Sequence, residues 1–512
     1  MLLTMLLLHG SSLKRQRSVR YLGVIFDQGL TWNAHISDLV KRCSHPMQMM
    51  RMVAKHDWGG DRASLKLMYI SLIRSKIDYG CFLYSNAATC HLEKLDRIQY
   101  EAIRLITGNY RPTFLENLEA EAHLMPLEFR RKQFELNYFG KVSRLPNHPV
   151  KKLYDQYHRY QFYDFRPHSD PLIGRVKALV SELEIPLAEI ETINSVDLYL
   201  PIKINVNFTL LKNKSSCSTL QFQQEYNSLV NLKYPNFTKI FTEGSKTSEG
   251  TGCAFFVDVT PPVTVRSRLP NTCGIFNAEM YALLIALHYI EGTNDDNFVI
   301  FSDSCSSLQY LCNSKLDHWI KIKIHKLLNA SAKNIIFEYV PGHTNIKGND
   351  QADLAAKQSI SDNFINNVPL SYSDYKYLIK TKIHRLWQRQ WSTATCRLHD
   401  FKPILGDWKS SYKDNRKDEK ILSRLRTGTC KFHIKIYLPT DNEPEICQYC
   451  QIEMSLEHLL VTCPALQQHL IPIKSHLHRK NKILNECNIL NDDFDHKLLF
   501  QYLKGINFFN KL

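Results

Sequence analysis

Four acidic side chains in this 512-residue sequence have types and spacings suited to holding divalent cations: Glu243, Glu279, Asp303 and Asp353. Carboxylates that converge repel one another unless cations lie among them. Mg²⁺ is the natural occupant because it is a hard cation that prefers oxygen ligands, and Mn²⁺ shares this preference. Two such ions about 4 Å apart can serve an in-line displacement at phosphorus. The sequence therefore predicts a magnesium-dependent phosphoryl-transfer site, provided that the fold brings the four carboxylates together.

A second set of metal-binding residue types lies near the C-terminus. Cys447 and Cys450 are separated by two residues, His458 follows after seven more, and Cys463 after another four. Three thiolates and one imidazole suit a tetrahedral Zn²⁺ ion. The spacing is close to that of zinc knuckles, although the gap before the histidine is longer. We predict structural zinc here, with unrelated reduced cysteines as the alternative.

The elements that would position the carboxylates begin near residue 236. Apolar runs rich in aromatic and β-branched residues predict four strands, over 237–243, 253–258, 298–303 and 335–340. Helical periodicity predicts a short helix after Ser304 and longer ones over 278–290, 319–328 and 350–358. Hairpin strands followed by alternating strands and helices are typical of an α/β fold with a mixed sheet flanked by helices.

Each carboxylate lies near the end of a predicted strand or the beginning of a predicted helix, where catalytic groups of α/β sheets gather. Glu243 ends the first strand, and Asp303 ends the third. Glu279 lies in the first turn of a helix that Asn277 is expected to cap, and Asp353 lies early in the last helix. The expected buried face of the Glu279 helix comprises Met280, Leu283, Leu284 and Leu287. Singly, each acid is better explained as a cap or turn residue, so the prediction depends on the combination.

The formal net charge of +15 is unevenly distributed. Residues 236–360 carry 11 basic and 12 acidic side chains, whereas residues 376–435 carry 16 basic and 5 acidic ones. Basic segments beside a neutral, carboxylate-bearing centre suggest a bound polyanion, and a basic solvated surface is the alternative. The basic segment also contains aromatic residues suited either to base stacking or to helix packing: Trp387, Trp391, Trp408 and Tyr412.

The cysteine pattern and the apolar runs indicate a reduced compartment and no membrane span. Fourteen cysteines are scattered, with regular close spacing in one cluster alone. The apolar run Leu2–Leu8 has no basic residue before it, so we interpret it as a strand rather than a secretory signal. No stretch approaches the roughly 20 apolar residues that a membrane span needs. We therefore expect an intracellular location, and the sequence does not distinguish the nucleus from the cytoplasm.

The stretches "IFTEGSK", "NAEMYALLIAL", "IFSDSCSSL" and "VPGHTNIKGNDQADLAAK" resemble, in order, the four blocks of type 1 ribonuclease H, over about residues 237–360. The resemblance implies that Glu243, Glu279, Asp303 and Asp353 bind two Mg²⁺ ions. It also implies that His343, in the loop before the last block, assists proton transfer or product release. The family has aspartate where this sequence has Glu243, which puts the reach of that carboxylate in question.

The stretch "VRYLGVIFDQGLTWNAHI", residues 19–36, resembles the segment after the catalytic palm in reverse transcriptases of non-LTR, jockey-like retrotransposons. The helical stretch to about residue 150 then resembles their thumb and connection, with an apolar helix face over Leu92–Gly108 that Gly108 should end. The Asp-Asp pairs at 295–296 and 492–493 lack the aromatic residue that precedes the family's polymerase signature. We therefore expect no DNA synthesis. The Cys/His stretch "CQYCQIEMSLEHLLVTCP" resembles the motif that trails the ribonuclease H domain in these elements.

The expected organisation follows from these resemblances and from composition. We predict a thumb and connection remnant, a connector, a ribonuclease H domain, a basic helical segment, a zinc-knuckle-like motif and a tail, over residues 1–150, 151–235, 236–360, 361–440, 441–470 and 471–512. The leading hypothesis is a nuclease that cuts the RNA strand of RNA–DNA hybrids with two Mg²⁺ ions. The alternative is a catalytically weakened nucleic-acid-binding remnant.

Overall fold

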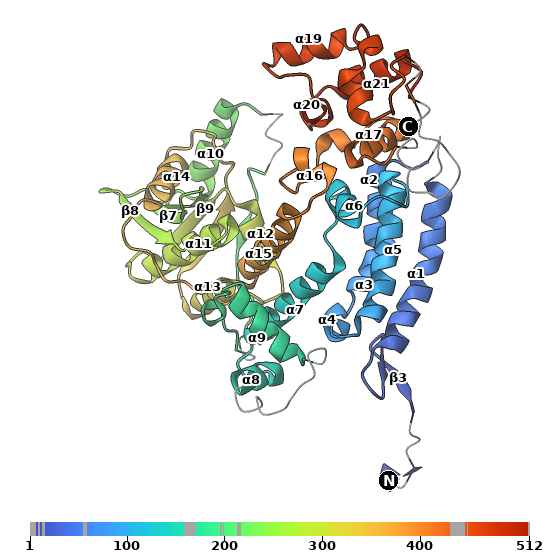
Figure 1. Cartoon of the computed structure of the whole chain (residues 1–512). Helices are drawn as coiled ribbons and strands as arrows, with labels where there is room; N and C mark the ends of the chain where they lie inside the picture. The colour runs from blue at the N-terminus through green and yellow to red at the C-terminus, as the bar shows by residue number, and fades with distance from the viewer. Residues whose placement is uncertain are drawn as a thin grey trace. The chain divides into compact units, whose positions relative to one another are not determined.

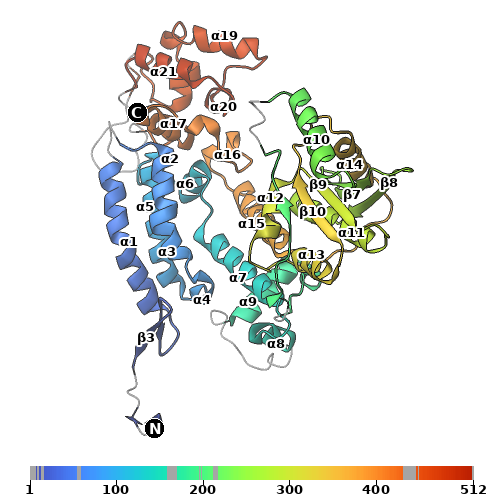
Figure 2. The ribbon, with the colours of Figure 1, turned by 180° about the vertical axis from the view of Figure 1, so that it is seen from behind.

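The computed structural model describes residues 7–8, 11–12, 16–54, 59–157, 170–194, 197, 199–211, 217–430, 446–447, 449–509 and 512. They form two compact units (Figures 1 and 2). The first unit comprises residues 1–135, 164–175 and 382–512, and the second comprises residues 136–163 and 176–381. Three of the four boundaries fall within helices α7 (Leu127–Ser143), α9 (Leu172–Glu182) and α15 (Tyr372–Ser392), and the fourth lies outside the described residues. Parts of the predicted connector, basic segment and zinc motif lie outside the described residues, as do residues 2–6 of the apolar run.

The second unit is built on a six-stranded mixed sheet with the order β5-β10-β9-β6-β7-β8. Its strands are β5 (Val206–Asn207), β6 (Thr238–Lys246), β7 (Thr251–Val257), β8 (Val263–Leu269), β9 (Asn297–Ser302) and β10 (Asn334–Tyr339). Strands β5, β10, β9 and β6 are parallel, whereas β7 and β8 are antiparallel to their neighbours. Its helices include α8 (Pro149–Asp155), η3 (Leu187–Glu189), α10 (Thr219–Lys233), α11 (Ile275–Glu291), α12 (Cys305–Cys312), α13 (Trp319–Ala330) and α14 (Lys347–Ser359).

Both faces of this sheet are covered by helices. Successive residues of a strand point to opposite sides, so neighbouring residues belong to different cores. Ile240 and Ile300 belong to the core beneath α11, α12 and α13. Phe241 and Phe301 belong to a second core beneath α10 and α14, which lie side by side in both views (Figures 1 and 2). The predicted α/β class, with a mixed sheet flanked by helices, is therefore confirmed.

Two strands and one helix extend the pattern predicted from sequence. The four predicted strands correspond to β6, β7, β9 and β10. The edge strand β8 follows them in the antiparallel part, and β5 adds a further parallel strand beside β10. Strand β5 and helix α10 come from the stretch predicted as a connector without clear motifs, so part of that stretch completes the sheet and covers one of its faces.

The N-terminal part of the first unit is mostly helical, as predicted. Its elements are β1 (Leu7–Leu8), β2 (Ser11–Ser12), β3 (Ser18–Tyr21), β4 (Val24–Asp27), α1 (Asn33–Val53), α2 (Arg62–Met68), η1 (Tyr69–Arg74), α3 (Ser75–Asp78), α4 (Cys81–Tyr84), α5 (Thr89–Thr107) and α6 (Leu115–Ala122). Leu95, Ala102 and Ile106 of α5 are buried, and α1 contributes to the same core. Gly108 follows α5 in the left-handed conformation at φ +75°, where glycine is favoured, which confirms the predicted helix end.

The C-terminal part of the first unit also consists of short helices. They are α16 (Arg397–Phe401), η6 (Lys409–Ser411), α17 (Arg416–Thr427), η7 (His458–Thr462), η8 (Pro464–Leu466), α19 (Ile471–Arg479), α20 (Glu486–Leu490) and α21 (His496–Gly505). Tyr502 of α21 donates a hydrogen bond to the carbonyl of Leu459 in η7, which fastens the tail to the Cys/His segment. Across the described residues, every helix is too short or too polar to cross a membrane.

A buried ionic cluster joins these two helical parts of the first unit. Arg62 of α2 pairs with Glu121 of α6 at 2.8 Å, and Arg426 of α17 lies 4.0 Å from the same carboxylate. Lys402 donates to the carbonyl of Ala120 at 2.9 Å, and burial lowers the pKa of Lys402 to about 8. Breaking such a pair leaves an uncompensated buried charge, which typically costs about 3–5 kcal/mol. The cluster therefore makes the C-terminal helices part of the N-terminal helical core.

Five of the 16 basic side chains in the predicted polyanion-binding segment are buried. Its buried basic side chains are Lys402, Arg416, Lys420, Arg424 and Arg426. Trp387 and Trp391 are also buried, so helix packing, the alternative left open above, accounts for both of these tryptophans. Residues 431–435 of the segment lie outside the described residues. The charge that this segment can offer to a nucleic acid is therefore smaller than the sequence count indicates.

Candidate active site

Three of the four predicted carboxylates converge at the end of the sheet that lies toward the carboxyl ends of the parallel strands β6 and β9. Glu243 lies in β6, Glu279 lies in α11, and Asp303 directly follows β9. One oxygen from each carboxylate lies within 4.8 Å of the others. The sheet register explains the convergence, because the preceding residues Thr242 and Ser302 are paired across β6 and β9. The sequence prediction of a carboxylate cluster is therefore matched by the geometry for these three residues.

Glu243 is not a turn residue. Strand β6 continues to Lys246, and Glu243 pairs with Ala254 of β7 in the middle of the ladder. Its side chain is buried, with 4% exposure. The predicted strand end at residue 243 was therefore too early, and the interpretation of this glutamate as an ordinary turn residue does not fit the structure.

A glycine places α11 close enough to β6 for Glu279 to reach the cluster. A Cβ atom added to Gly244 would lie 2.8 Å from the backbone nitrogen of Glu279, so a larger residue would push the helix away. The four predicted stripe residues of α11 are buried, as expected. The predicted cap at Asn277 was wrong, because α11 begins one turn earlier, after Gly274. Asn277 instead donates to Asp374 at 2.5 Å, inside a buried polar network.

The loop after β10 lies directly against Asp303. A Cβ atom added to Gly342 would lie 2.0 Å from Asp303 Oδ2, so only glycine permits this approach. The next residue, His343, is exposed and has a left-handed backbone at φ 57°, as does Asn345. Such values are uncommon for residues with a side chain and mark a loop of defined shape. His343 could be predicted from the sequence, whereas Gly342 could not, because its role depends on a contact distant in sequence.

Asp353 does not join the three converging carboxylates in this structure. It lies on α14 with a side chain that is 26% exposed, and it pairs with Lys357 one turn later at 2.6 Å. Its charge nevertheless contributes to raising the pKa of Glu243 and of Glu279, after larger contributions from burial. Asp353 is therefore close enough to influence the ionisation of the cluster but is not one of the converging carboxylates.

The three carboxylates form a site that favours a cation. Burial, reinforced by the charges of Glu279 and Asp303, raises the pKa of Glu243 to about 10. Burial and Asp303 also raise the pKa of Glu279 well above its ordinary value. Glu279 Oε2 is buried and has no hydrogen-bond partner among the described residues. A divalent cation would give the buried acceptor a partner. Its positive charge would also allow the neighbouring carboxylates to ionise together, so these residues fit Mg²⁺.

We expect Mg²⁺ to stabilise the second unit increasingly as the pH rises. The folded, metal-free site keeps protons that the unfolded chain releases above about pH 4.5, so raising the pH from about 5 to about 9 should lower the free energy of unfolding. Mg²⁺ binds the ionised folded site and opposes this loss, by about 2.7 kcal/mol at a hundredfold excess over Kd. Thermal unfolding at several pH values, with and without Mg²⁺, measures the effect.

The matched control for this experiment is the double variant Glu243→Gln, Glu279→Gln. It removes the two groups with raised pKa, so it should show a weaker dependence on pH and no increment from Mg²⁺. An equal Mg²⁺ increment in the native protein and the double variant would mean that the ion binds elsewhere.

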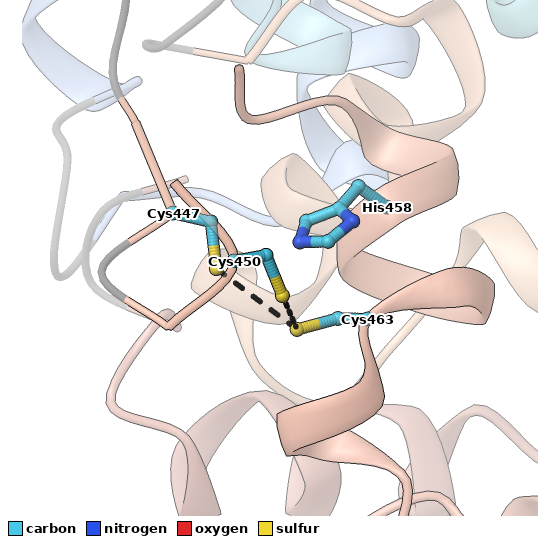
Figure 3. A group of neighbouring side chains, drawn as sticks. All are labelled: Cys447, Cys450, His458 and Cys463. Carbon is cyan, nitrogen blue, oxygen red and sulfur yellow. Dashed lines mark hydrogen bonds between the residues drawn. The ribbon is translucent and has the colours of Figure 1, made fainter. Parts of the chain in front are cut away.

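The predicted zinc ligands come together at a second site, in the first unit (Figure 3). The sulfur of Cys463 lies 4.0 Å from that of Cys447 and 3.7 Å from that of Cys450. Zn–S bonds of about 2.3 Å at tetrahedral angles place two sulfurs about 3.8 Å apart, which agrees with these distances. The ligand atoms of all four residues lie within 4.8 Å of one another.

The chemistry of this Cys/His cluster also fits a zinc ion. His458 is buried, and its Nε2 has no hydrogen-bond partner among the described residues. Burial opposes ionisation of Cys447, but hydrogen bonds from His458 and from the backbone of Tyr449 and Cys450 lower its pKa to about 6. A thiolate beside an unpaired imidazole nitrogen is the donor set that Zn²⁺ takes.

Comparisons with known proteins agree with this arrangement. Residues 235–361 match the RNase H family. The chain is 32% identical over 97 residues to "Probable RNA-directed DNA polymerase from transposon X-element" of Drosophila melanogaster, covering 18% of this chain and 10% of that protein. It is 26% identical over 153 residues to "RNA-directed DNA polymerase from mobile element jockey" of the same species, covering 28% and 16%.

Among solved structures, RNase H1 from the halophilic archaeon Halobacterium salinarum NRC-1 aligns with 15% identity and a TM-score of 0.21, over 25% of this chain and 99% of that one. The aligned segments span 10% and 16% of the two retrotransposon proteins, far less than their full lengths. Residues 235–361 are therefore a ribonuclease H domain, in a chain related to the reverse transcriptases of non-LTR retrotransposons.

Proposed function

We propose that this chain hydrolyses the RNA strand of RNA–DNA hybrids with two Mg²⁺ ions held by Glu243, Glu279, Asp303 and Asp353. The observation that carries the proposal is the convergence of three carboxylates within 4.8 Å, in a domain of the RNase H family. Asp353 is not among these three, and in this proposal its side chain leaves Lys357 to bind the second ion. When bound, the ions supply Lewis-acid activation of water and neutralise charge on the leaving oxygen.

The chain's own residues would then act on the substrate in defined roles. The exposed His343, which follows Gly342 in the loop packed against Asp303, would move a proton or help the product leave. The 2′-hydroxyl groups distinguish the RNA strand from the DNA strand. Exposed basic side chains outside the near-neutral domain would attract the phosphates of the substrate. The basic residues of the ionic cluster are buried, so they would not contribute.

A cleavage assay on three substrates tests the proposal. The same end-labelled RNA is presented in a hybrid with DNA, as a single strand and in an RNA duplex. We expect Mg²⁺-dependent cleavage of the hybrid and negligible cleavage of the other two. Equal cleavage of all three substrates would indicate another nuclease activity or a contaminant.

The second candidate function is hybrid binding without efficient cleavage. The observation that favours it is Glu243, which is one methylene longer than the aspartate of the family and whose pKa is raised to about 10. A ligand that is misplaced by about 1 Å can cost about 10²-fold in rate. Tight binding of the hybrid without cleavage in Mg²⁺ or Mn²⁺ would favour this candidate.

We also propose that the Cys/His cluster binds one structural Zn²⁺ ion, and a metal titration of the full chain tests this. The purified protein should contain one zinc per chain, and Co²⁺ substitution should produce thiolate-to-cobalt absorption. Cys463→Ser removes a ligand, so it should weaken binding by more than the roughly 10–100-fold that loss of an outer hydrogen-bond partner costs. Cys487→Ser, a cysteine outside the cluster, is the control and should change nothing. A zinc-free protein without cobalt absorption would contradict this proposal.

A further inference from the structure

A buried asparagine holds the unusual glutamate of the candidate active site. Asn349, in the first turn of α14, is 3% exposed, and its Nδ2 donates to Glu243 Oε1 at 2.7 Å. This is the side-chain hydrogen bond that the structure records for the Glu243 carboxylate among its described residues. The bond links α14 to β6 at the first of the three converging carboxylates.

The position of Asn349 is fixed by close packing of α14 on β6. Gly348 precedes it, and a Cβ atom added there would lie 2.2 Å from the ring of Phe241, two residues before Glu243. The helix therefore begins against the strand at a distance that only glycine allows. Because both backbones are held in this way, the amide of Asn349 has little freedom to move away from the carboxylate.

The buried Asn349 side chain destabilises the fold unless the hydrogen bond of its amino group is needed. Its Oδ1 is buried and has no hydrogen-bond partner among the described residues. Leaving a buried acceptor without a donor is destabilising, so each such group in a native protein calls for an explanation. An apolar residue of similar volume would avoid this cost. What the asparagine supplies, and an apolar residue would not, is a donor aimed at Glu243.

A donor at this point addresses the extra reach of glutamate. Glu243 carries one more methylene than the family's aspartate, so its carboxylate has an additional rotatable bond to be fixed. The bond from Asn349 engages Oε1 and leaves Oε2 available to a cation. It also favours the ionised carboxylate, opposing the effect of burial and of the neighbouring acids.

We propose that Asn349 is a positioning residue that holds Glu243 in the orientation required for cation binding, and so compensates for the longer side chain. The proposal rests on the proposed function, because it assumes that Glu243 binds a cation. It also predicts that Asn349 matters because position 243 is a glutamate, and would matter less with aspartate, whose carboxylate is retracted from the donor by about one bond length.

A double-mutant cycle tests this dependence. Asn349→Ala and the nearly isosteric Asn349→Leu are made in the native chain and in Glu243→Asp. Mn²⁺ binding to the zinc-loaded full chain, followed by electron paramagnetic resonance without substrate, is the first readout, and single-turnover cleavage of the hybrid is the second. In the native background, both variants should weaken Mn²⁺ binding and slow cleavage by about 10–100-fold, the usual effect of losing a ligand's hydrogen-bond partner. In Glu243→Asp, the loss should be less than about threefold.

Two controls separate a failure of the positioning role of Asn349 from a failure of the proposed two-metal nuclease function. Gln351→Ala changes an exposed residue of the same helix and should leave both readouts unchanged. Glu279→Gln removes a proposed ligand and should abolish strong Mn²⁺ binding. If Glu279→Gln has no effect on Mn²⁺ binding, the proposed function fails.

Positioning is refuted if Glu279→Gln loses Mn²⁺ and both Asn349 variants still bind like the native chain. An equal loss in the glutamate and aspartate backgrounds would also refute it, because Asn349 would then act independently of Glu243. Thermal unfolding shows whether each variant is folded, and Asn349→Leu preserves packing if Asn349→Ala does not fold.

Discussion

Asp303→Asn should reduce Mg²⁺-dependent cleavage of the hybrid by at least about 10²-fold, the scale expected when a catalytic group is lost or misplaced. Asp303 follows β9 and is only partly buried, so an isosteric amide should not disturb the fold. The change removes one negative charge from a cluster that must offset two dications. It should therefore lower the rate of the chemical step rather than the affinity for the hybrid, since removing a carboxylate reduces repulsion of phosphates.

Single-turnover rates and hybrid binding, measured separately, test both parts of this prediction. Asp258→Asn is the matched control, because Asp258 also follows a strand directly, at the opposite end of the sheet, and is exposed. It should cleave at the native rate. An Asp303→Asn protein that cleaves as fast as the native chain would show that the three converging carboxylates are not the catalytic site.

The converging carboxylates could be predicted from sequence because strand ends have a local signature. Apolar runs that stop at an acid placed Asp303 directly after β9, and helical periodicity placed Glu279 on a buried helix. Edge strand β8 was missed because only Ser267 and Leu269 of its seven residues are buried, so its apolar residues do not mark a buried side. Strand β5 has only two residues, too few for any periodicity.

Other features of the site depend on contacts that sequence patterns do not encode. Asn349 and Gly342 act through residues that are distant in sequence, Glu243 and Asp303, and neither residue type predicts such a contact by itself. The pairing of Asp353 with Lys357 depends on the orientation of its side chain, which a sequence pattern does not encode. Asn349 lies within the stretch "VPGHTNIKGNDQADLAAK", which resembles a block of type 1 ribonuclease H. That resemblance could have drawn attention to Asn349, although it does not show which residue accepts from the amide.

The charge count of the basic segment was misleading for a related reason. A count of Lys and Arg does not distinguish exposed side chains from buried ones, and buried charges are retained only with partners. A partner can be distant in sequence, as Glu121 of α6 is from Arg426 of α17. Nucleic-acid binding by this chain should therefore be tested with substitutions of exposed basic residues, because deleting the segment would remove part of the first unit's core.

Glu243→Asp should increase hybrid cleavage, but by less than the roughly 10²-fold cost of a full 1 Å displacement, because Asn349 already offsets part of that cost. Glu243 is buried inside β6, so its backbone position is fixed and the extra methylene must be accommodated by the side chain alone. Mg²⁺ demands near-ideal octahedral geometry at about 2.0–2.1 Å, and a displacement of about 1 Å can cost about 10²-fold in rate. Aspartate restores the reach that the ribonuclease H family uses. Single-turnover rates on one hybrid provide the measurement, and Glu249→Asp, an exposed glutamate after the same strand, is the control.

Two further measurements separate geometry from charge at this position. Glu243→Gln keeps the length and removes the charge, so it should lower or abolish cleavage. Mn²⁺ also prefers oxygen ligands and should partly rescue the native chain if it accepts a distorted ligand set. The rescue should be smaller in Glu243→Asp, whose ligand geometry no longer needs correction. If Glu243→Asp is slower than the native chain, the longer carboxylate is instead the ligand to which this site is fitted, and Asn349 holds it in its productive position rather than compensating for a defect.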